Sequence, residues 1–300
     1  MKLTRPGSSK PSAIGRGTPA GSLRSVFSLW TVLGGLAGAL MALVWHMPAQ
    51  WLANGLNEAS KGQVQLQEAQ GSVWQGSGKL VLTGGAGSRD ALALPGRIHW
   101  HMNFSGGAGN VPGLNLKVQA PCCMTQAVQV HVTPLKAFSV WQFQIDDHRS
   151  EWPAHWLTGL GSPWNTLQPE GALVLETKQM VLEFGRQQAH MVGRLSLTAL
   201  NLSSKLSTLK PMGTYELSLA SGAGNTASNT ASSTEPLTSP QLILTTQSGS
   251  LLLSGQGQWQ GTHFQFRGEA SAVPEHAAAL SNLLNIIGRR PGARSLLSLG

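Results

Sequence analysis

The sequence contains few residues whose types and spacing could carry out chemistry. His99 and His101 come closest to a metal site, because alternate residues of a strand share one face. A zinc site needs one or two further ligands, and no nearby cluster of histidine, cysteine or carboxylate supplies them. Asp146 and Asp147 are consecutive, so on a strand they would face opposite sides and could not work together as acid and base. We interpret them, with His148, as a hairpin turn.

Motifs that mark catalysis or cofactor binding are missing as well. The sequence has no Walker A loop, no HExxH zinc motif and no GxSxG nucleophile elbow. A catalytic centre needs convergent groups in defined roles, and the carboxylates that could supply them are sparse. We therefore predict that the protein is not an enzyme, that it uses no cofactor, and that it has no catalytic, cofactor-binding or metal-binding residues.

The two cysteines, Cys122 and Cys123, are adjacent in the chain. Neighbouring residues cannot form an ordinary disulfide without distorting the peptide between them. Two reduced, partly buried thiols are therefore the simpler expectation. A vicinal disulfide, or a bond to another chain, is the alternative in an oxidising compartment.

The ten tryptophans are a compositional excess, and several of them fall within strand patterns. Large aromatic side chains usually serve core packing or interfaces, and an aromatic groove for a lipid or a sugar is the sharper alternative. The residues that we predict to be structural or to form an interface are Trp74, Trp100, Tyr215, Trp259, Leu283, Leu284 and Ile287.

Most of the chain alternates apolar and polar residues with the period of a β-strand. Few helical patterns separate these segments, so we predict a mainly β fold with one large antiparallel domain, built as a curved sheet, a sandwich or a partial barrel. The predicted strands are residues 63–67, 72–74, 79–83, 98–104, 114–118, 127–132, 140–145, 173–176, 180–184, 194–202, 214–219, 241–246, 250–254 and 263–270.

A few segments interrupt the strand pattern. Residues 48–60, 153–160 and 274–287 show helical spacing, and each begins at a proline, which suits a first helical turn. Residues 221–240 contain no large apolar residue except Leu237, so they cannot bury enough surface to order themselves, and we predict a flexible loop.

An apolar segment near the N-terminus predicts a transmembrane helix. Residues Val26 to Trp45 are uncharged, and a helix of this length would span about 30 Å, the thickness of a bilayer core. Trp30 and Trp45 lie near its ends, as interfacial aromatic residues do. Gly34 and Gly38 have the GxxxG spacing that supports helix contacts in membranes. A cleaved signal peptide and a buried core helix are the alternatives.

Charge gives the predicted helix a direction. Residues 1–25 carry five basic residues and no acid, and the last twelve residues carry three of the remaining positive charges, so the body of the chain is neutral. By the positive-inside rule, residues 1–25 form a disordered cytoplasmic tail, residues 26–45 span the membrane, and residues 46–300 form a domain on the far side. A nucleic-acid binder would carry a basic folded domain, so nucleic acid is not a predicted partner.

A series of short motifs follows in a specific order along nearly the whole chain. The motifs include Pro48-Ala-x-Trp51, Ala69-x-Gly71-Ser-Val-Trp74-x-Gly76, Leu94-Pro95 before Trp100, Trp152-Pro153-Ala154-x-Trp156-Leu157, Gly161-x-Pro163-x-Asn165-Thr166-Leu167, Pro211-x-Gly213-x-Tyr215, Gly255-x-Gly257-x-Trp259-x-Gly261 and Asn282-Leu283-Leu284-Asn285-Ile286-Ile287-Gly288. In their order and spacing, these motifs resemble the family of protein N of the type II secretion system, also called general secretion pathway protein N.

The resemblance implies a non-enzymatic accessory subunit of the apparatus that exports folded proteins across the outer membrane. It also implies a single-pass protein of the cell inner membrane with a periplasmic domain, and other inner-membrane secretion subunits as partners. The alternative is a membrane-anchored periplasmic protein that binds or transfers lipid in a β-groove, because a partial barrel of alternating strands can present an apolar groove.

Overall fold

The protein is described from a computed structural model, which places residues 29–106, 112–136, 138–185, 189–221, 240–260, 263–289, 292 and 294–299. The chain divides into two compact units, Met1–Trp45 and His46–Gly300. Three predicted features lie outside the described residues: the cytoplasmic tail 1–25, Val26 of the anchor, and residues 222–239 of the flexible loop.

The described part of the first unit is helix α1, Leu29–Trp45. Its sequence is apolar throughout, and it contains Trp30, Gly34 and Gly38 of the predicted span. Residues 26–28 of that span are not described. Within the described residues, no helix combines the length and the apolar character needed to cross a membrane.

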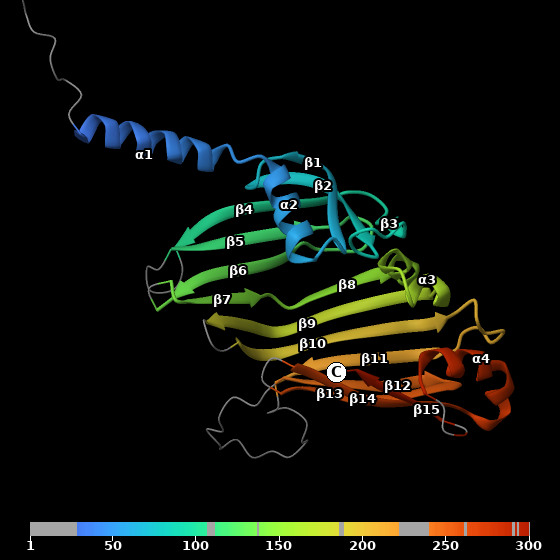
Figure 1. Cartoon of the computed structure of the whole chain (residues 1–300). Coiled ribbons are helices and arrows are strands. Elements are labelled where there is room, and N and C mark those ends of the chain that lie inside the picture. Colours follow the sequence, from blue (N-terminus) through green and yellow to red (C-terminus); the bar gives the residue numbers. More distant parts are fainter. Residues whose placement is uncertain are drawn as a thin grey trace, which may run out of the picture. The chain divides into compact units, whose positions relative to one another are not determined.

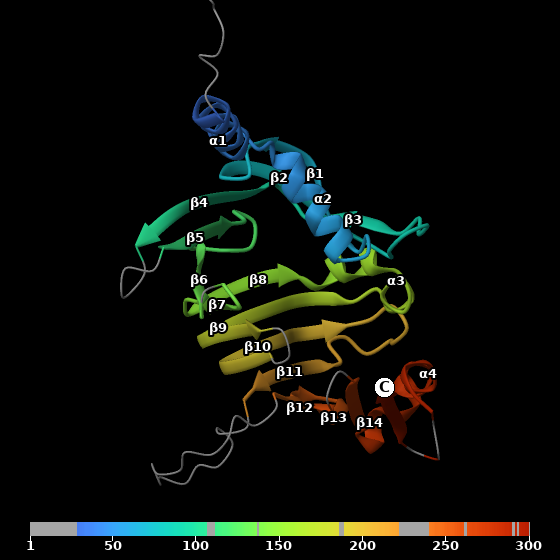
Figure 2. The same ribbon diagram turned by 60° about the vertical axis from the view of Figure 1, so that its left-hand side comes forward.

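The second unit is built on one open, 15-stranded antiparallel sheet, which confirms the predicted mainly β fold class with few helices. Its order is β1-β2-β4-β5-β6-β7-β9-β10-β11-β12-β13-β14-β15, with β3 added on β2 and β8 on β9 (Figures 1 and 2). The bounds are β1 Val64–Gly71, β2 Gln75–Thr83, β3 Ala91–Ala93, β4 Ile98–Gly106, β5 Pro112–Gln119, β6 Val128–Leu135, β7 Val140–Ile145, β8 His148–Pro153, β9 Glu170–Gly185, β10 Ala189–Ser203, β11 Gly213–Ala220, β12 Gln241–Gly249, β13 Leu251–Gln260, β14 His263–Ala272 and β15 Ser295–Leu299.

Register gives this sheet one apolar face. Met102, Leu116, Val130, Ile145 and Met180 are successive cross-strand partners from β4 to β9. Because side chains directly opposite each other share a face, these residues form an apolar row across five strands.

The row continues beyond β9. Met191 of β10 pairs with Leu182 of β9, which lies on the same face as Met180 two residues away. The pairing of β10 with β9 then shifts register between Val192 and Arg194. Leu195 pairs with Leu219, and Leu219 pairs with Leu242. We call the face defined by these two rows the apolar face. The opposite face is polar, as the partners His101, Lys117 and Gln129 illustrate.

The predicted hairpin turn at Asp146–His148 is wrong. Strands β7 and β8 both pair antiparallel with β9 along the same edge. They therefore run in the same direction, one after the other, and Asp146 and Asp147 join them without reversing the chain. The Asp147 carboxylate accepts the backbone N–H of Gln179 at 2.6 Å. Gln179 has a φ of 48° and marks the bulge in β9 at which its pairing passes from β7 to β8. The two aspartates therefore lie where the pairing of β9 passes from β7 to β8, and Asp147 caps the bulge there.

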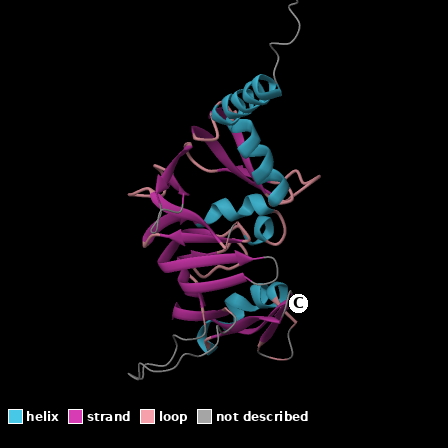
Figure 3. Cartoon of the chain, turned by 90° about the vertical axis from the view of Figure 1, so that its left-hand side faces the viewer, coloured by secondary structure: helices cyan, strands magenta, loops and turns pink. Residues whose placement is uncertain are grey.

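Helices cover the two ends of the apolar face (Figure 3). Helix α2 (Ala49–Ala59) packs Leu52 and Leu56 against a cluster with Leu66 and Trp100. Helix α4 (Ala277–Ile287) buries Leu280, Leu283 and Leu284 in a second cluster on β11, β13 and β14. The remaining helices, η1 Ala154–Leu160, α3 Trp164–Leu167 and η2 Pro274–His276, are short. The helical segments predicted at 48–60, 153–160 and 274–287 are thus confirmed.

Candidate interaction surfaces

The predicted metal-like pair is not part of a larger cluster. His99 and His101 share the polar face, opposite Gln119 and Lys117, and both are exposed. Across the described ranges, no group of three or more histidines, cysteines or carboxylates could hold a metal ion. Within those ranges, the two histidines therefore lack the further ligands that a zinc site needs.

Between the helices, the apolar face is only half-buried. Val132, Phe143, Leu182, Leu197 and Leu219 are all partly exposed. They belong to none of the three buried clusters found among the described residues. We call these five residues the open middle of the apolar face.

One end of the strands adds exposed aromatic side chains to this surface. Phe104 lies near the end of β4, Trp141 near the start of β7, Phe184 near the end of β9 and Trp259 near the end of β13, and Phe138 lies in the β6–β7 turn. Their exposure runs from 38% at Trp259 to 66% at Phe138, although all five are large and apolar. We call these five residues the aromatic rim. Exposed apolar surface on a soluble domain marks candidate binding sites.

Aromatic contacts organise the rim. Trp141 is the direct cross-strand partner of Phe184, and Phe184 lies edge-on to Phe143 with ring centroids 5.6 Å apart. Phe138 contacts Trp141 with a centroid distance of 6.1 Å. Because aromatic side chains have few rotatable bonds, such a cluster is rigid and offers a large contact area at low entropic cost.

The predicted structural or interface residues fall into two groups. Trp100, Tyr215, Leu283 and Leu284 are buried. Burial also raises the pKa of Tyr215, since the ionised form would lose its hydration. Ile287 packs against the α4 cluster, and Trp74 and Trp259 lie on aromatic neighbours near the strand ends, Phe104 and Phe264. Sequence reasoning did not single out Phe104, Phe138 or Phe184 as interface candidates.

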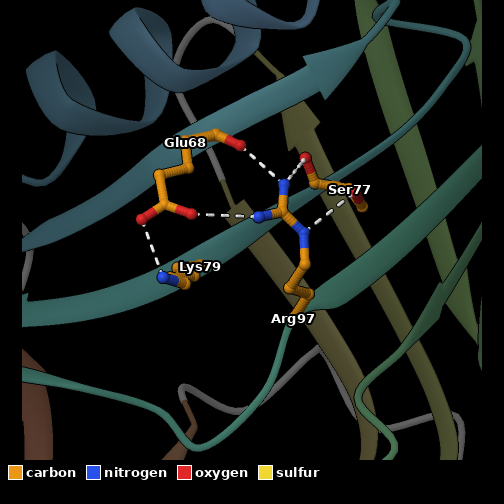
Figure 4. Close-up of polar contacts among 4 residues, drawn as sticks. All are labelled: Glu68, Ser77, Lys79 and Arg97. Atoms are coloured by element: carbon orange, nitrogen blue, oxygen red, sulfur yellow. Dashed lines mark hydrogen bonds and ion pairs between the residues drawn. The ribbon is translucent and has the colours of Figure 1, made fainter.

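A polar cluster near β1 is structural in character (Figure 4). Glu68 accepts a hydrogen bond from the Lys79 ammonium at 2.7 Å and another from the Arg97 guanidinium at 3.2 Å. Arg97 also donates to the Glu68 backbone carbonyl at 2.6 Å and to Ser77. The hydrogen bond from Lys79, followed by the charges of Lys79 and Arg97, lowers the pKa of the Glu68 carboxyl. The cluster clamps the bulge of β1 to β2, and as an exposed ion pair it contributes little to stability.

A groove of about 990 Å³ lies where the β5–β6 connection meets β8. Cys122, Met124 and Pro121 line one side, and Glu151 and Trp152 of β8 line the other. Cys122 and Cys123 form a disulfide between adjacent residues, so the structure differs from the simpler expectation of two thiols. The groove lies in the size range of ligand-binding clefts.

Comparisons with known proteins give one family match. The family model described as "Type II secretion system (T2SS), protein N" matches residues 62–297. No curated protein and no solved structure matches the chain.

Proposed function

From the premise that the chain belongs to the family of protein N of the type II secretion system, we infer that it is a non-enzymatic, inner-membrane accessory subunit of that machine. The family itself implies an accessory role in type II secretion. Membrane location, topology and partners are our proposal.

The proposed anchor is the apolar segment that contains α1. The helix carries no charged residue from Leu29 to Trp45, and five basic residues precede it. These features support insertion with residues 1–25 in the cytoplasm and the sheet unit in the periplasm.

The observation that carries an interaction role is the aromatic rim. Five large apolar side chains are exposed at one end of the sheet. Burying them against a partner would favour association, because apolar surface would be removed from water. We propose that the rim contacts another inner-membrane subunit of the secretion machine.

We expect loss of the rim to reduce capture of partner subunits. Trp141→Ala with Phe184→Ala removes two adjacent, exposed rings, so the fold should tolerate the change while the contact area is lost. The measurement is recovery of secretion subunits with the tagged full chain after cross-linking in intact membranes, quantified by mass spectrometry. Recovery should fall by about tenfold, since hot-spot aromatic residues contribute on the order of 2 kcal/mol or more.

Val192→Ala is the matched control, because Val192 is also half-exposed but lies on the polar face beside Met191. Equal recovery with the rim variant and the control would exclude the rim as the contact, and recovery of no secretion subunit at all would count against the function.

The open middle of the apolar face favours a second function, binding of lipid. Leu195, Leu219 and Leu242 continue an apolar row that begins on β4, and acyl chains are the uncharged, extended ligands such a surface suits. Phospholipid should therefore accompany the full chain purified in mild detergent.

Two neighbouring substitutions separate the faces of the sheet. Leu219→Asp places a charge in the open middle, whereas Ser218→Asp places the same charge on the polar face one residue away. Native mass spectrometry should detect bound phospholipid with the unaltered chain and with Ser218→Asp, and a strongly reduced amount with Leu219→Asp. Identical lipid content in the two variants would mean that any bound lipid lies on the proposed anchor, and it would exclude lipid binding by the open middle of the apolar face.

A further inference from the structure

The two cysteines of the Cys122–Cys123 disulfide differ in their exposure. Both line the groove between the β5–β6 connection and β8, and Cys122 is exposed there. Cys123 is only 7% exposed and packs in a cluster with Leu94 and Ala120. Because the reactivity of a cysteine depends on its exposure, a reagent in solvent meets Cys122 first.

The groove gives another protein access to Cys122. Its volume is about 990 Å³, and its walls include the apolar side chains of Pro95, Pro121, Met124 and Trp152. Thiol–disulfide exchange requires that a thiolate reach one sulfur of the disulfide. A loop that carries a thiol can lie against these walls and reach Cys122 while the sheet stays folded.

The disulfide lies in a turn that holds the β5–β6 connection to β8. The backbone N–H groups of Cys123 and Met124 donate to the Ala120 carbonyl, at 3.0 and 2.9 Å. The N–H of Glu151 in β8 donates to the Cys123 carbonyl at 2.8 Å. Because the bonded cysteines are neighbours, the disulfide closes a small ring that contains their peptide bond and restricts its backbone dihedral angles. Reduction would open this ring and free the carbonyl that holds β8.

From these observations we propose that the Cys122–Cys123 disulfide is a thiol–disulfide exchange site for a dithiol protein, and that its reduction loosens the β5–β6 connection from β8. A thiolate of the dithiol protein attacks Cys122 Sγ, the bond between the two cysteines breaks, and the Cys123 thiolate leaves and takes up a proton. The second thiol of the dithiol protein loses its proton and attacks that protein's own sulfur in the mixed disulfide. Cys122 then leaves as a thiolate and is protonated, so two electrons reach the chain and the dithiol protein ends as a disulfide.

The first experiment tests whether Cys122 is the accessible sulfur. Cys123→Ser leaves a single thiol at Cys122, and Cys122→Ser, its matched control, leaves a single thiol at Cys123. Both full chains are reduced in non-ionic detergent and treated with iodoacetamide, and the alkylated fraction is followed by mass spectrometry. We expect the Cys122 thiol to react about tenfold faster, because it is exposed. Equal rates, or a faster reaction at Cys123, would overturn attack at Cys122.

The second experiment tests the structural effect and needs no substitution in the reacting chain. Dithiothreitol, a small dithiol, is added to the unaltered full chain, and hydrogen exchange is resolved to single amides by mass spectrometry. The Glu151 amide should exchange about tenfold faster after reduction, because the turn that supplies its acceptor is loosened. The Asp146 amide is the internal control, since it donates to the Gln129 carbonyl at 3.1 Å, away from the disulfide, and should not change.

The variant with both Cys122→Ser and Cys123→Ser shows whether the change arises at this disulfide, because dithiothreitol should leave its exchange unaltered. A disulfide that dithiothreitol reduces only after urea unfolds the chain, or a Glu151 amide that exchanges equally before and after reduction, would overturn the proposal. The inference goes beyond the proposed function. Capture of secretion subunits through the aromatic rim is measured separately, so failure here leaves that function standing.

Discussion

Replacing Trp100 with alanine is expected to lower the free energy of unfolding of the sheet unit by about 3–5 kcal/mol, the usual cost of removing a buried aromatic side chain. Trp100 is 4% exposed and packs with Ala49 and Leu66, so it joins α2 to the sheet. Its indole N–H donates to the carbonyls of Ser72 and Val73, at 3.2 and 3.1 Å. The substitution would leave a cavity and remove the donor for both carbonyls.

The indole ring of Trp100 lies directly against the backbone of β2. Gly76 is the cross-strand partner of Trp100, and a Cβ atom at Gly76 would lie 2.4 Å from the indole ring, so glycine is the residue that allows this close approach. Removing a ring packed this closely leaves a cavity beside β2, and the cost of a large-to-small core substitution rises with the volume of that cavity.

Urea unfolding of the full chain in mild detergent, followed by circular dichroism, measures the change. Trp141→Ala is the control, because Trp141 is 42% exposed on the aromatic rim and its removal should cost about 1 kcal/mol or less. Similar losses for Trp100→Ala and Trp141→Ala would mean that Trp100 does not anchor α2 to the sheet.

The sequence predicts the strands well because the period of two is local. Residues 98–104, 114–118 and 140–145 correspond to β4, β5 and β7, and the antiparallel class follows from short connections between such strands. The long β9 is different. The sequence predicts two short strands, 173–176 and 180–184, where the structure has one strand from Glu170 to Gly185 with a bulge at Gln179. A bulge breaks the alternation, so the pattern reads as a gap.

The interaction surfaces depend on which parts of the sheet are covered by helices and on how distant segments align, and the alternation of apolar and polar residues reports neither. Apolar alternation looks the same whether a helix covers the strand, as α2 covers Trp100, or leaves it open, as at Phe143 and Phe184. The groove beside β8 arises because β8 continues past the start of β6, which is a matter of register between distant segments. Asp147 likewise contacts Gln179 across 32 positions of sequence.

The second large effect concerns the proposed anchor. Replacing Leu36 and Leu40 of α1 with lysine should move the chain from the membrane to the soluble fraction. Each central lysine opposes insertion of a helix by about 2.5–3.5 kcal/mol, so the pair costs about 5–7 kcal/mol, enough to abolish a single-pass anchor. The measurement is carbonate extraction of cell membranes, followed by quantification of the chain in pellet and supernatant.

Leu36→Ala with Leu40→Ala is the control, because it shortens the same side chains without adding charge and should stay in the pellet. The two compact units make the test specific: α1 belongs to a different unit from the sheet, so the lysine variant should unfold in urea with the same midpoint as the control. If the lysine variant remains in the pellet with its sheet unit folded, the sheet unit itself holds the protein at the membrane. The aromatic rim, which is exposed and apolar, would then be the contact to test, and the Trp141→Ala, Phe184→Ala variant should release the chain in the same extraction.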